Sequence, residues 1–191
     1  MKYSRAPFAR PTRHCPARLA WAVALALLPC LLSGVARPEV VLAVSNGRIL
    51  FASERTGNWD LFTMDADGGN VVNVTNSPAD EERGGFSPDG RQIAFARAVG
   101  DNTDIYKMNA DGSHVQRLTT HPGIDHAPQW SPDGTKIAFR SDRDGNNNVY
   151  LMNADGSGQT AITTNPANDD GPDWAPDGQH LVFASDRTGN S

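Results

Sequence analysis

The stretch Trp130-Ser131-Pro132-Asp133-Gly134 decides the architecture of this chain, because it occurs three times at one spacing. It returns as Phe86-Ser87-Pro88-Asp89-Gly90 and as Trp174-Ala175-Pro176-Asp177-Gly178, each 44 residues from its neighbour. The same step separates Phe51, Phe95, Phe139 and Phe183; Met64, Met108 and Met152; and Thr75, Thr119 and Thr163. A fixed period of this length is the signature of a repeat protein.

One repeat contains four short segments of strand character. In the second repeat, Ser-Pro-Asp-Gly predicts a reverse turn after a strand that ends at Phe86. Residues 92–97 and 103–108 are the next predicted strands, and the first of these has two apolar faces, so both must be covered. The Asn-Ala-Asp-Gly turn at 109–112 opens a more polar strand at 114–119, which we expect at the outer edge.

Four antiparallel strands in each 44-residue period predict an all-β fold, a β-propeller of four-stranded blades. A β-sandwich would also contain short strands, but it has no reason to keep a residue-level period. We place the blades at about 39–75, 83–119 and 127–163, with a partial fourth blade at 171–191. About three and a half blades make an incomplete ring, so we expect Leu181 and Phe183 to lack a cover.

The first 36 residues have the pattern of a secretory signal peptide. Five basic residues and no acidic residue precede an apolar run from Leu19 to Leu32, and small residues follow at Gly34 and Ala36. An uncleaved membrane anchor is the alternative, but the run is short for a bilayer and Pro29 interrupts it. We therefore assign 1–36 as the signal and 37–191 as the propeller, with no membrane span after cleavage.

Removal of the signal would change the cysteine content and the charge of the chain. Both cysteines, Cys15 and Cys30, lie within it, so the mature protein would contain no thiol and no disulfide. Cys30 is a poor lipoprotein attachment site because Pro29 precedes it. All 22 acidic but only 12 of the 17 basic residues follow Ala36, which makes the mature charge about −10 and argues against nucleic acid as a partner.

The residues predict no metal, cofactor or catalytic site. Asp142 to Asn146 begins like a calcium loop, but it lacks the required Gly and Glu at Asn147 and Asn153, and its counterparts in other repeats indicate a structural turn. His114, His121 and His126 lack the fixed spacing of zinc ligands. No Gly-x-Ser-x-Gly elbow occurs, which argues against a serine hydrolase in this chain.

One set of residues is a candidate binding site for a partner. The set occupies equivalent positions in three repeats, just before Gly84, Ala127 and Gly171: Glu81, Glu82, Asp125, His126, Asp169 and Asp170. Loops before the innermost strands of a propeller converge on one mouth of the central channel, so the carboxylates would share one rim and their fields would add. The alternative is that these acids are solvated or cap turns.

These motifs resemble the TolB-type propeller repeat, also called the WD-like propeller repeat. In the third repeat the matching residues are Pro128, Trp130, Ser131 to Gly134, Phe139, Ser141-Asp142-Arg143, Gly145-Asn146 and Met152 to Gly156. The resemblance covers about 40–191. True WD repeats are disfavoured, because Gly-His and Trp-Asp pairs do not recur from repeat to repeat.

The resemblance implies a periplasmic binding platform. We therefore expect an exported, non-enzymatic propeller that binds a protein or peptide partner in the bacterial cell envelope, in the periplasm or outside the cell. The alternative is the N-terminal propeller of an exported prolyl-oligopeptidase-like serine peptidase whose catalytic domain is absent from this chain.

Overall fold

The computed structural model describes residues 47–189, which form thirteen β-strands and no helix. Accordingly, no helix of this part is long and apolar enough to cross a membrane. The predicted signal peptide, both cysteines and the predicted strand at 40–44 lie outside the described residues.

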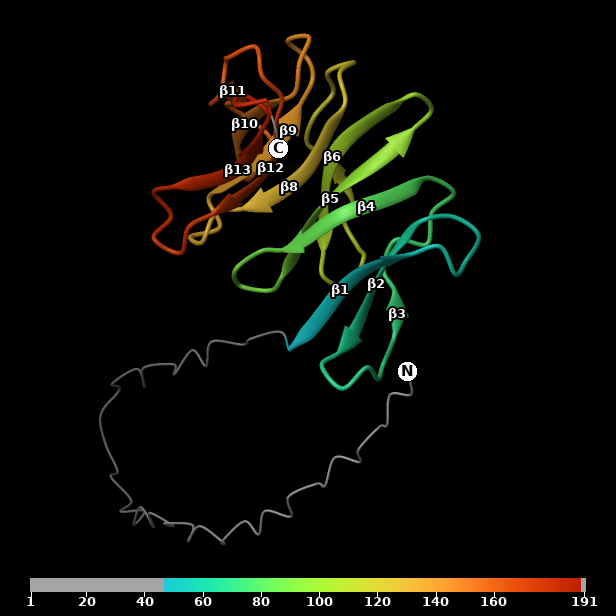
Figure 1. The fold of residues 1–191 in the computed structure, drawn as a ribbon. Helices are drawn as coiled ribbons and strands as arrows, with labels where there is room; N and C mark the ends of the chain where they lie inside the picture. The colour runs from blue at the N-terminus through green and yellow to red at the C-terminus, as the bar shows by residue number, and fades with distance from the viewer. Residues whose placement is uncertain (1–46, 190–191) are drawn as a thin grey trace, which may run out of the picture. The chain divides into compact units, whose positions relative to one another are not determined.

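The strands form four antiparallel sheets that follow one another along the chain (Figure 1). The first sheet contains β1 (Arg48–Ser53), β2 (Asp60–Asp65) and β3 (Val72–Asn73). The second contains β4 (Asp80–Phe86), β5 (Gln92–Val99), β6 (Asn102–Asn109) and β7 (Gln116–Arg117). The third contains β8 (Asp125–Trp130), β9 (Lys136–Ser141), β10 (Asn148–Asn153) and β11 (Thr160–Ala161), and the fourth β12 (Asp169–Trp174) and β13 (Leu181–Ser185).

This arrangement confirms the predicted propeller blades. Within each sheet the strands pair in chain order, and the first strands β4, β8 and β12 contact one another from sheet to sheet. The first strand of each blade is therefore innermost. The array formed by the described residues is open, with two four-stranded blades between a three-stranded and a two-stranded sheet.

The two faces of β5 are covered as its sequence predicts. Ile93 and Phe95 are fully buried in a cluster with Leu61 and Val74 of the first sheet. Ala94 and Ala96 point the other way and are buried against the third sheet, where Trp130 and Phe139 lie. Full burial of one large apolar side chain stabilises the fold by roughly 1.5–3 kcal/mol, so packing between sheets is a major source of stability.

The uncovered face of the fourth sheet is not the predicted one. Leu181 and Phe183 are half-buried, whereas Val182 between them is 67% exposed. The alternation of a strand explains the difference, because Leu181 and Phe183 share one face and Val182 points to the other. At the opposite end of the described array, Ile49 is 43% exposed.

The outermost strands are shorter than predicted. In the second blade the ladder contains only Gln116 and Arg117 of the predicted 114–119. His114 has a left-handed backbone, with φ of 56°, which delays entry into the strand. At the other end, the hydroxyl of Thr119 accepts the hydrogen bond of Ile105 N at 3.0 Å, so a side chain replaces a regular ladder partner.

The hydrogen bond accepted by the threonine hydroxyl recurs in three blades, which explains why threonine recurs every 44 residues. Thr75 and Thr163 accept from Leu61 N and Val149 N in the same way, at 2.9 and 3.0 Å. Each threonine hydroxyl in turn donates to a side-chain oxygen at the start of the third strand of its blade: Asp60, Asp104 or Asn148. The threonines therefore join the outer segment of each blade to its third strand.

The Asp-Gly turn before the outer strand packs on the preceding blade. Gly112 has φ of 87°, and a Cβ atom at this position would lie 2.2 Å from the carbonyl oxygen of Val74 in the first blade. Gly68 has the same φ and the same place in the first blade, but nothing lies within 4 Å of the corresponding Cβ position. The two glycines therefore share a backbone conformation and differ in contact with a neighbouring blade.

This pair of glycines provides a test of packing between blades. We expect Gly68→Ala to cost about 1 kcal/mol of stability, because alanine disfavours positive φ. Gly112→Ala should cost a further 1–3 kcal/mol or so, because the added methyl group must displace backbone. Urea denaturation of both variants measures the difference, and equal losses would contradict contact between the blades at Gly112.

Candidate functional site

The six candidate residues lie within the innermost strands and not in the loops before them. The prediction placed Glu81, Glu82, Asp125, His126, Asp169 and Asp170 before the strands, but β4, β8 and β12 begin at Asp80, Asp125 and Asp169. Their backbones are already paired with the second strand, as Glu81 with Arg97 and Asp125 with Ser141. Strand alternation therefore sends adjacent candidates to opposite faces.

Three of the six are buried and cannot line a rim. Glu81, Asp125 and Asp169 each have a relative exposure of 0%. Each carboxylate is paired with an arginine of its own blade: Arg97, Arg143 and Arg187, at 2.8, 2.9 and 3.1 Å. The expectation that all six carboxylate and histidine side chains share one rim is therefore wrong for these three.

The arginine of each pair also stacks on aromatic side chains. The guanidinium carbon of Arg143 lies 5.5 Å from the ring centroid of Phe139 and 4.6 Å from that of Tyr150. Arg97 lies in the same way over Phe95 and Tyr106, at 5.4 and 4.9 Å. Cation–π contacts of this kind contribute roughly 0.5–2 kcal/mol. These stacks are a finding that the repeat motif did not predict.

Two residues of these pairs and stacks, one in the third blade and one in the fourth, have shifted pKa values. Burial raises the pKa of Asp169, but hydrogen bonds from Ser185 and other neighbours outweigh it and hold the pKa at about 2. Burial and a hydrogen bond donated to Asp144 raise the pKa of Tyr150 to about 12. Asp169 therefore stays ionised and Tyr150 neutral, as parts of the framework.

The second blade departs from this plan at the end of its second strand. The first, third and fourth repeats have Ser-Glu/Asp-Arg there, at 53–55, 141–143 and 185–187, whereas the second has Arg97-Ala98-Val99. The arginine therefore comes two residues earlier, and its buried partner is the longer Glu81 instead of an aspartate. Ala98 stands where the other repeats have an acid, a deviation that the sequence alone displays.

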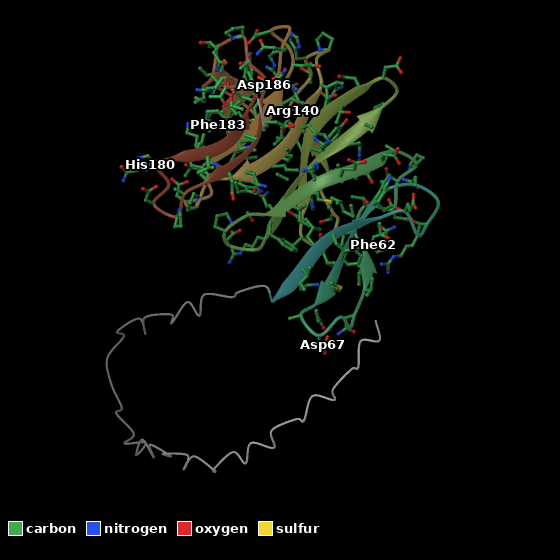
Figure 2. All side chains as sticks on the ribbon, viewed as in Figure 1. Phe62, Asp67, Arg140, His180, Phe183 and Asp186 are labelled. Carbon is green, nitrogen blue, oxygen red and sulfur yellow. The ribbon has the colours of Figure 1, made fainter. Side chains whose placement is uncertain are left out.

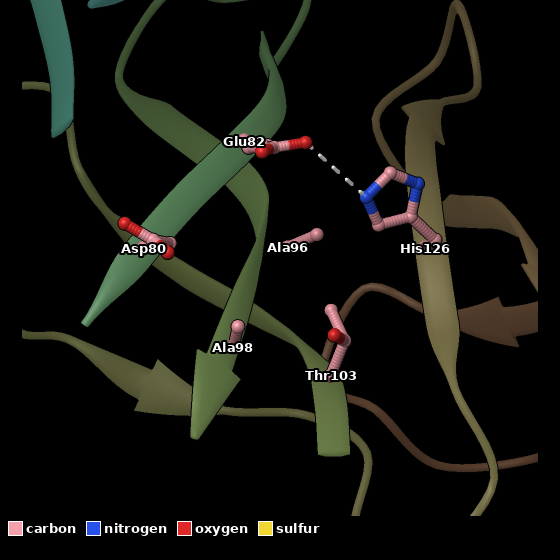
Figure 3. Close-up of a pocket in the computed structure, with 6 residues that line it drawn as sticks. All are labelled: Asp80, Glu82, Ala96, Ala98, Thr103 and His126. Carbon is pink, nitrogen blue, oxygen red and sulfur yellow. Dashed lines mark ion pairs between the residues drawn. The ribbon is translucent and has the colours of Figure 1, made fainter. Parts of the chain in front are cut away.

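The remaining candidates form a row of partly exposed side chains along the three innermost strands, namely Glu82, His126 and Asp170. We call these three residues the exposed row. Figure 3 shows Glu82 of β4 pointing toward His126 of β8, with 3.8 Å between Oε2 and Nε2. Asp170 of β12 is paired with Arg140 of β9 at 3.3 Å. The row therefore runs across three consecutive blades.

A bulge follows the exposed row in every described innermost strand. Arg83, Ala127 and Gly171 all have positive φ, between 50° and 59°, and the strand register shifts at each of them. Residues other than glycine rarely adopt this conformation, and such strain is often found at functional sites. Because the extra residue reverses the later alternation, the exposed row and the apolar core side chains can belong to one strand.

The described residues contain no group of three or more His, Cys, Asp or Glu side chains placed to hold a metal ion. His114 lies beside Asn109 and Ser113, and His121 accepts a hydrogen bond from Gly123 N, so these two histidines take part in local turns. The loop at 142–146 is likewise a turn, in which Asp142 accepts from Ile124 N at 2.7 Å.

The buried pair of the third blade permits a stability test. Asp125→Asn should lower the free energy of unfolding by about 3–5 kcal/mol, because it leaves the enclosed Arg143 without its counter-charge. Asp170→Asn is the control, since its ion pair is partly exposed and should change stability by at most about 1 kcal/mol. Chemical denaturation decides between them, and equal effects would contradict the assigned difference in burial.

His126 predicts a pH dependence of stability. Burial, followed by the charge of Arg140, lowers the pKa of His126 below its ordinary value of 6.5. As the pH falls through about 6.5, the unfolded chain therefore binds this proton first, and the free energy of unfolding decreases. The loss ends once the folded histidine is also protonated.

The variant His126→Gln should remove this part of the pH dependence. Denaturation midpoints are measured from pH 8 to pH 5, and the wild-type midpoint should fall relative to that of the variant only below about pH 7. A difference that stays constant over the whole range would show that His126 does not titrate differently in the folded state.

Comparison with known proteins agrees with this geometry. The family model described as the TolB β-propeller domain matches residues 83–159 and 120–191. A curated relative, the Protein TolB homolog of Chlorobaculum tepidum, is 43% identical over 53 residues, which are 28% of this chain and 12% of that protein.

Solved structures share the fold. A protein described as TolB from Agrobacterium tumefaciens has a TM-score of 0.67 at 29% identity, over 73% of this chain and 50% of that one. TolB from Acinetobacter baumannii has 0.65 at 25% identity, over 72% and 34%. The chain thus spans half or less of the length of these proteins.

More distant similarity concerns the fold alone. A structure from a study of two prolyl endopeptidases has a TM-score of 0.56 at 16% identity, over 73% of this chain and 25% of that one. The family model, in contrast, covers more than half of the chain and spans the second, third and fourth repeats. This chain belongs to the TolB β-propeller domain family.

Proposed function

We propose that the chain is part of an exported, non-enzymatic propeller that binds a protein or peptide partner in the bacterial envelope through the exposed row. The observation that carries this proposal is the division of the candidate residues. Three carboxylates are buried in ion pairs with arginines, while 46% and 49% of the side-chain surfaces of Glu82 and Asp170 are exposed.

The row has the properties of a preorganised polar contact surface. Its members come from three innermost strands, so their separation is maintained by packing of whole blades. The preceding buried pairs hold each strand start in place, and the bulges lie directly after it. A partner with basic groups would meet carboxylates that already have a defined position, which reduces the entropy lost on binding.

Export and envelope location are part of the proposal. The signal-like segment at 1–36 and the similarity to TolB proteins support them. The peptidase alternative has weaker support, since its structural relative is similar only in fold.

The test is neutralisation of the exposed row. Immobilised wild type, Glu82→Gln/Asp170→Asn and Glu54→Gln/Asp101→Asn are compared for capture of proteins from a periplasmic extract. The last variant is the matched control, because it removes the same charge from exposed acids outside the row. We expect capture to fall at least tenfold in the row variant only, and to weaken with salt, since exposed charges are screened over about 8 Å at physiological ionic strength.

Equal capture by all three proteins would contradict a binding role for the row. Loss of capture in both variants would show that net charge, and not the row, attracts the partner. Chemical denaturation of each variant checks the fold, because exposed substitutions usually change stability by about 0.5 kcal/mol or less.

A further inference from the structure

A cavity of about 130 Å³ opens between the second and third blades beside the exposed row. Ala96 and Ala98 of β5 form its apolar part, and Asp80, Glu82, Thr103 and His126 provide polar groups. In Figure 3 the two alanines lie below the line that joins Glu82 to His126. A cavity of this size has room for several water molecules, or for a planar polar group and adjoining methylenes.

The repeat shows what occupies the same place one blade later. Ala96 corresponds to Arg140, one 44-residue period further along the chain. Arg140 projects from β9 at the junction of the third and fourth blades, where its guanidinium is 3.3 Å from Asp170 and its side chain is only 20% exposed. The protein thus places an arginine of its own beside the exposed row at this junction.

The alanine at position 98 is a second difference between the second and third blades. Ala98 corresponds to Asp142, whose carboxylate accepts a hydrogen bond from Ile124 N just before the first strand of its own blade. Alanine at both positions leaves the junction of the second and third blades open. Both substitutions relative to the third blade lie on the same face of β5, because the positions are two residues apart.

The first junction has Ala52 at the position equivalent to Ala96, but an arginine of the neighbouring strand β4 lies beside it. Arg83 lines the cavity between the first two blades together with Ala52, Trp59 and Glu82. The cavity between the second and third blades has no arginine on its lining, although Asp80 and Glu82 line it. Carboxylate acceptors are therefore present, and alanine stands where the third blade has Arg140.

We propose that this cavity receives an arginine side chain of a peptide or protein partner, which takes the place that Arg140 occupies one blade later. The proposal rests on the proposed binding function and names the group that the row recognises. The methylenes of the ligand would pack on Ala96 and Ala98. The planar guanidinium would donate two parallel hydrogen bonds to the two oxygens of the Glu82 carboxylate. Arginine is preferred to lysine for this geometry.

The cavity lining supplies two carboxylates for a cation, Asp80 and Glu82. Burial, together with the positive charges of Arg140 and Arg83, lowers the pKa of His126, which favours the neutral ring at neutral pH. The charges of these two arginines count against a further cation, and the two carboxylates act in the opposite direction. A neutral imidazole can accept a hydrogen bond and does not repel a guanidinium. Asp80 already accepts a hydrogen bond from Trp59 N at 2.9 Å, so Glu82 is the main acceptor available to a ligand.

The first test uses short peptides and the full chain. Acetyl-Gly-Arg-Gly-amide is titrated by NMR against the wild type, and the citrulline analogue, which has the same shape without the charge, is the control. We expect the arginine peptide to shift the amide signals of Ala96, Ala98 and Thr103, and to bind at least tenfold more tightly than the citrulline peptide. Equal binding of the two peptides, or no shift at these amides, overturns the proposal.

Two substitutions that exchange the residues at equivalent positions of the second and third blades make the test specific. Ala96→Arg copies Arg140 into the second blade, so it should occupy the cavity and weaken peptide binding at least tenfold. Arg140→Ala should open the equivalent space beside Asp170 and produce a second set of shifts in β9 and β12. Unchanged peptide binding by Ala96→Arg overturns the proposal. Glu82→Gln provides an independent check if Ala96→Arg folds poorly, since this exposed change should still weaken binding about fivefold or more.

The outcomes separate this inference from the proposed function. If the peptide fails to bind while Glu82→Gln/Asp170→Asn still loses captured partners, the row binds proteins and the arginine inference is wrong. If the peptide binds in the cavity but capture is insensitive to the row variant, the arginine site stands and the wider binding role of the row fails.

Discussion

The structure depends on the mutual covering of neighbouring sheets. A single blade has apolar side chains on both faces of its second strand, as Ile93 and Phe95 on one face of β5 and Ala94 and Ala96 on the other. Such a blade cannot exclude water from both faces by itself. Each blade therefore folds only in contact with its neighbours, and the faces at the two ends of the described array contain the exposed Ile49 and Val182.

Polar interactions specify how the blades are built within this apolar stack. The buried carboxylate at the start of the innermost strand, the arginine that pairs with it and the aromatic rings beneath that arginine connect the first three strands of a blade. The threonine hydroxyl then joins the outer segment. A buried ion pair adds little net stability, but loss of one partner is costly. These groups therefore favour one register over others.

Departures from the repeat are more informative about function than the repeat itself. Positions that serve packing, such as Phe95, Phe139 and Phe183, keep their residue type in every blade. Positions beside the exposed row differ, with Ala52, Ala96, Arg140 and Ala184 at one place and Glu54, Ala98, Asp142 and Asp186 at another. Because all blades share one backbone plan, each exchange changes the local surface without a change of fold. A cavity and a filled junction can thus arise from the same scaffold.

The sequence by itself determined the repeat, the number and order of strands in a blade, and the turn at Ser-Pro-Asp-Gly, because these depend on local periodicity and on residues adjacent in the chain. It also identified the six positions at which polar groups gather. Only the tertiary structure decided that Glu81, Asp125 and Asp169 are buried while Glu82, His126 and Asp170 remain accessible. A shift of register by one residue moves every side chain of a strand to the opposite face. The bulges at Arg83, Ala127 and Gly171 cause such a shift within each innermost strand. The cavity beside Ala96 likewise required two blades 44 residues apart to be brought together, which no local pattern specifies.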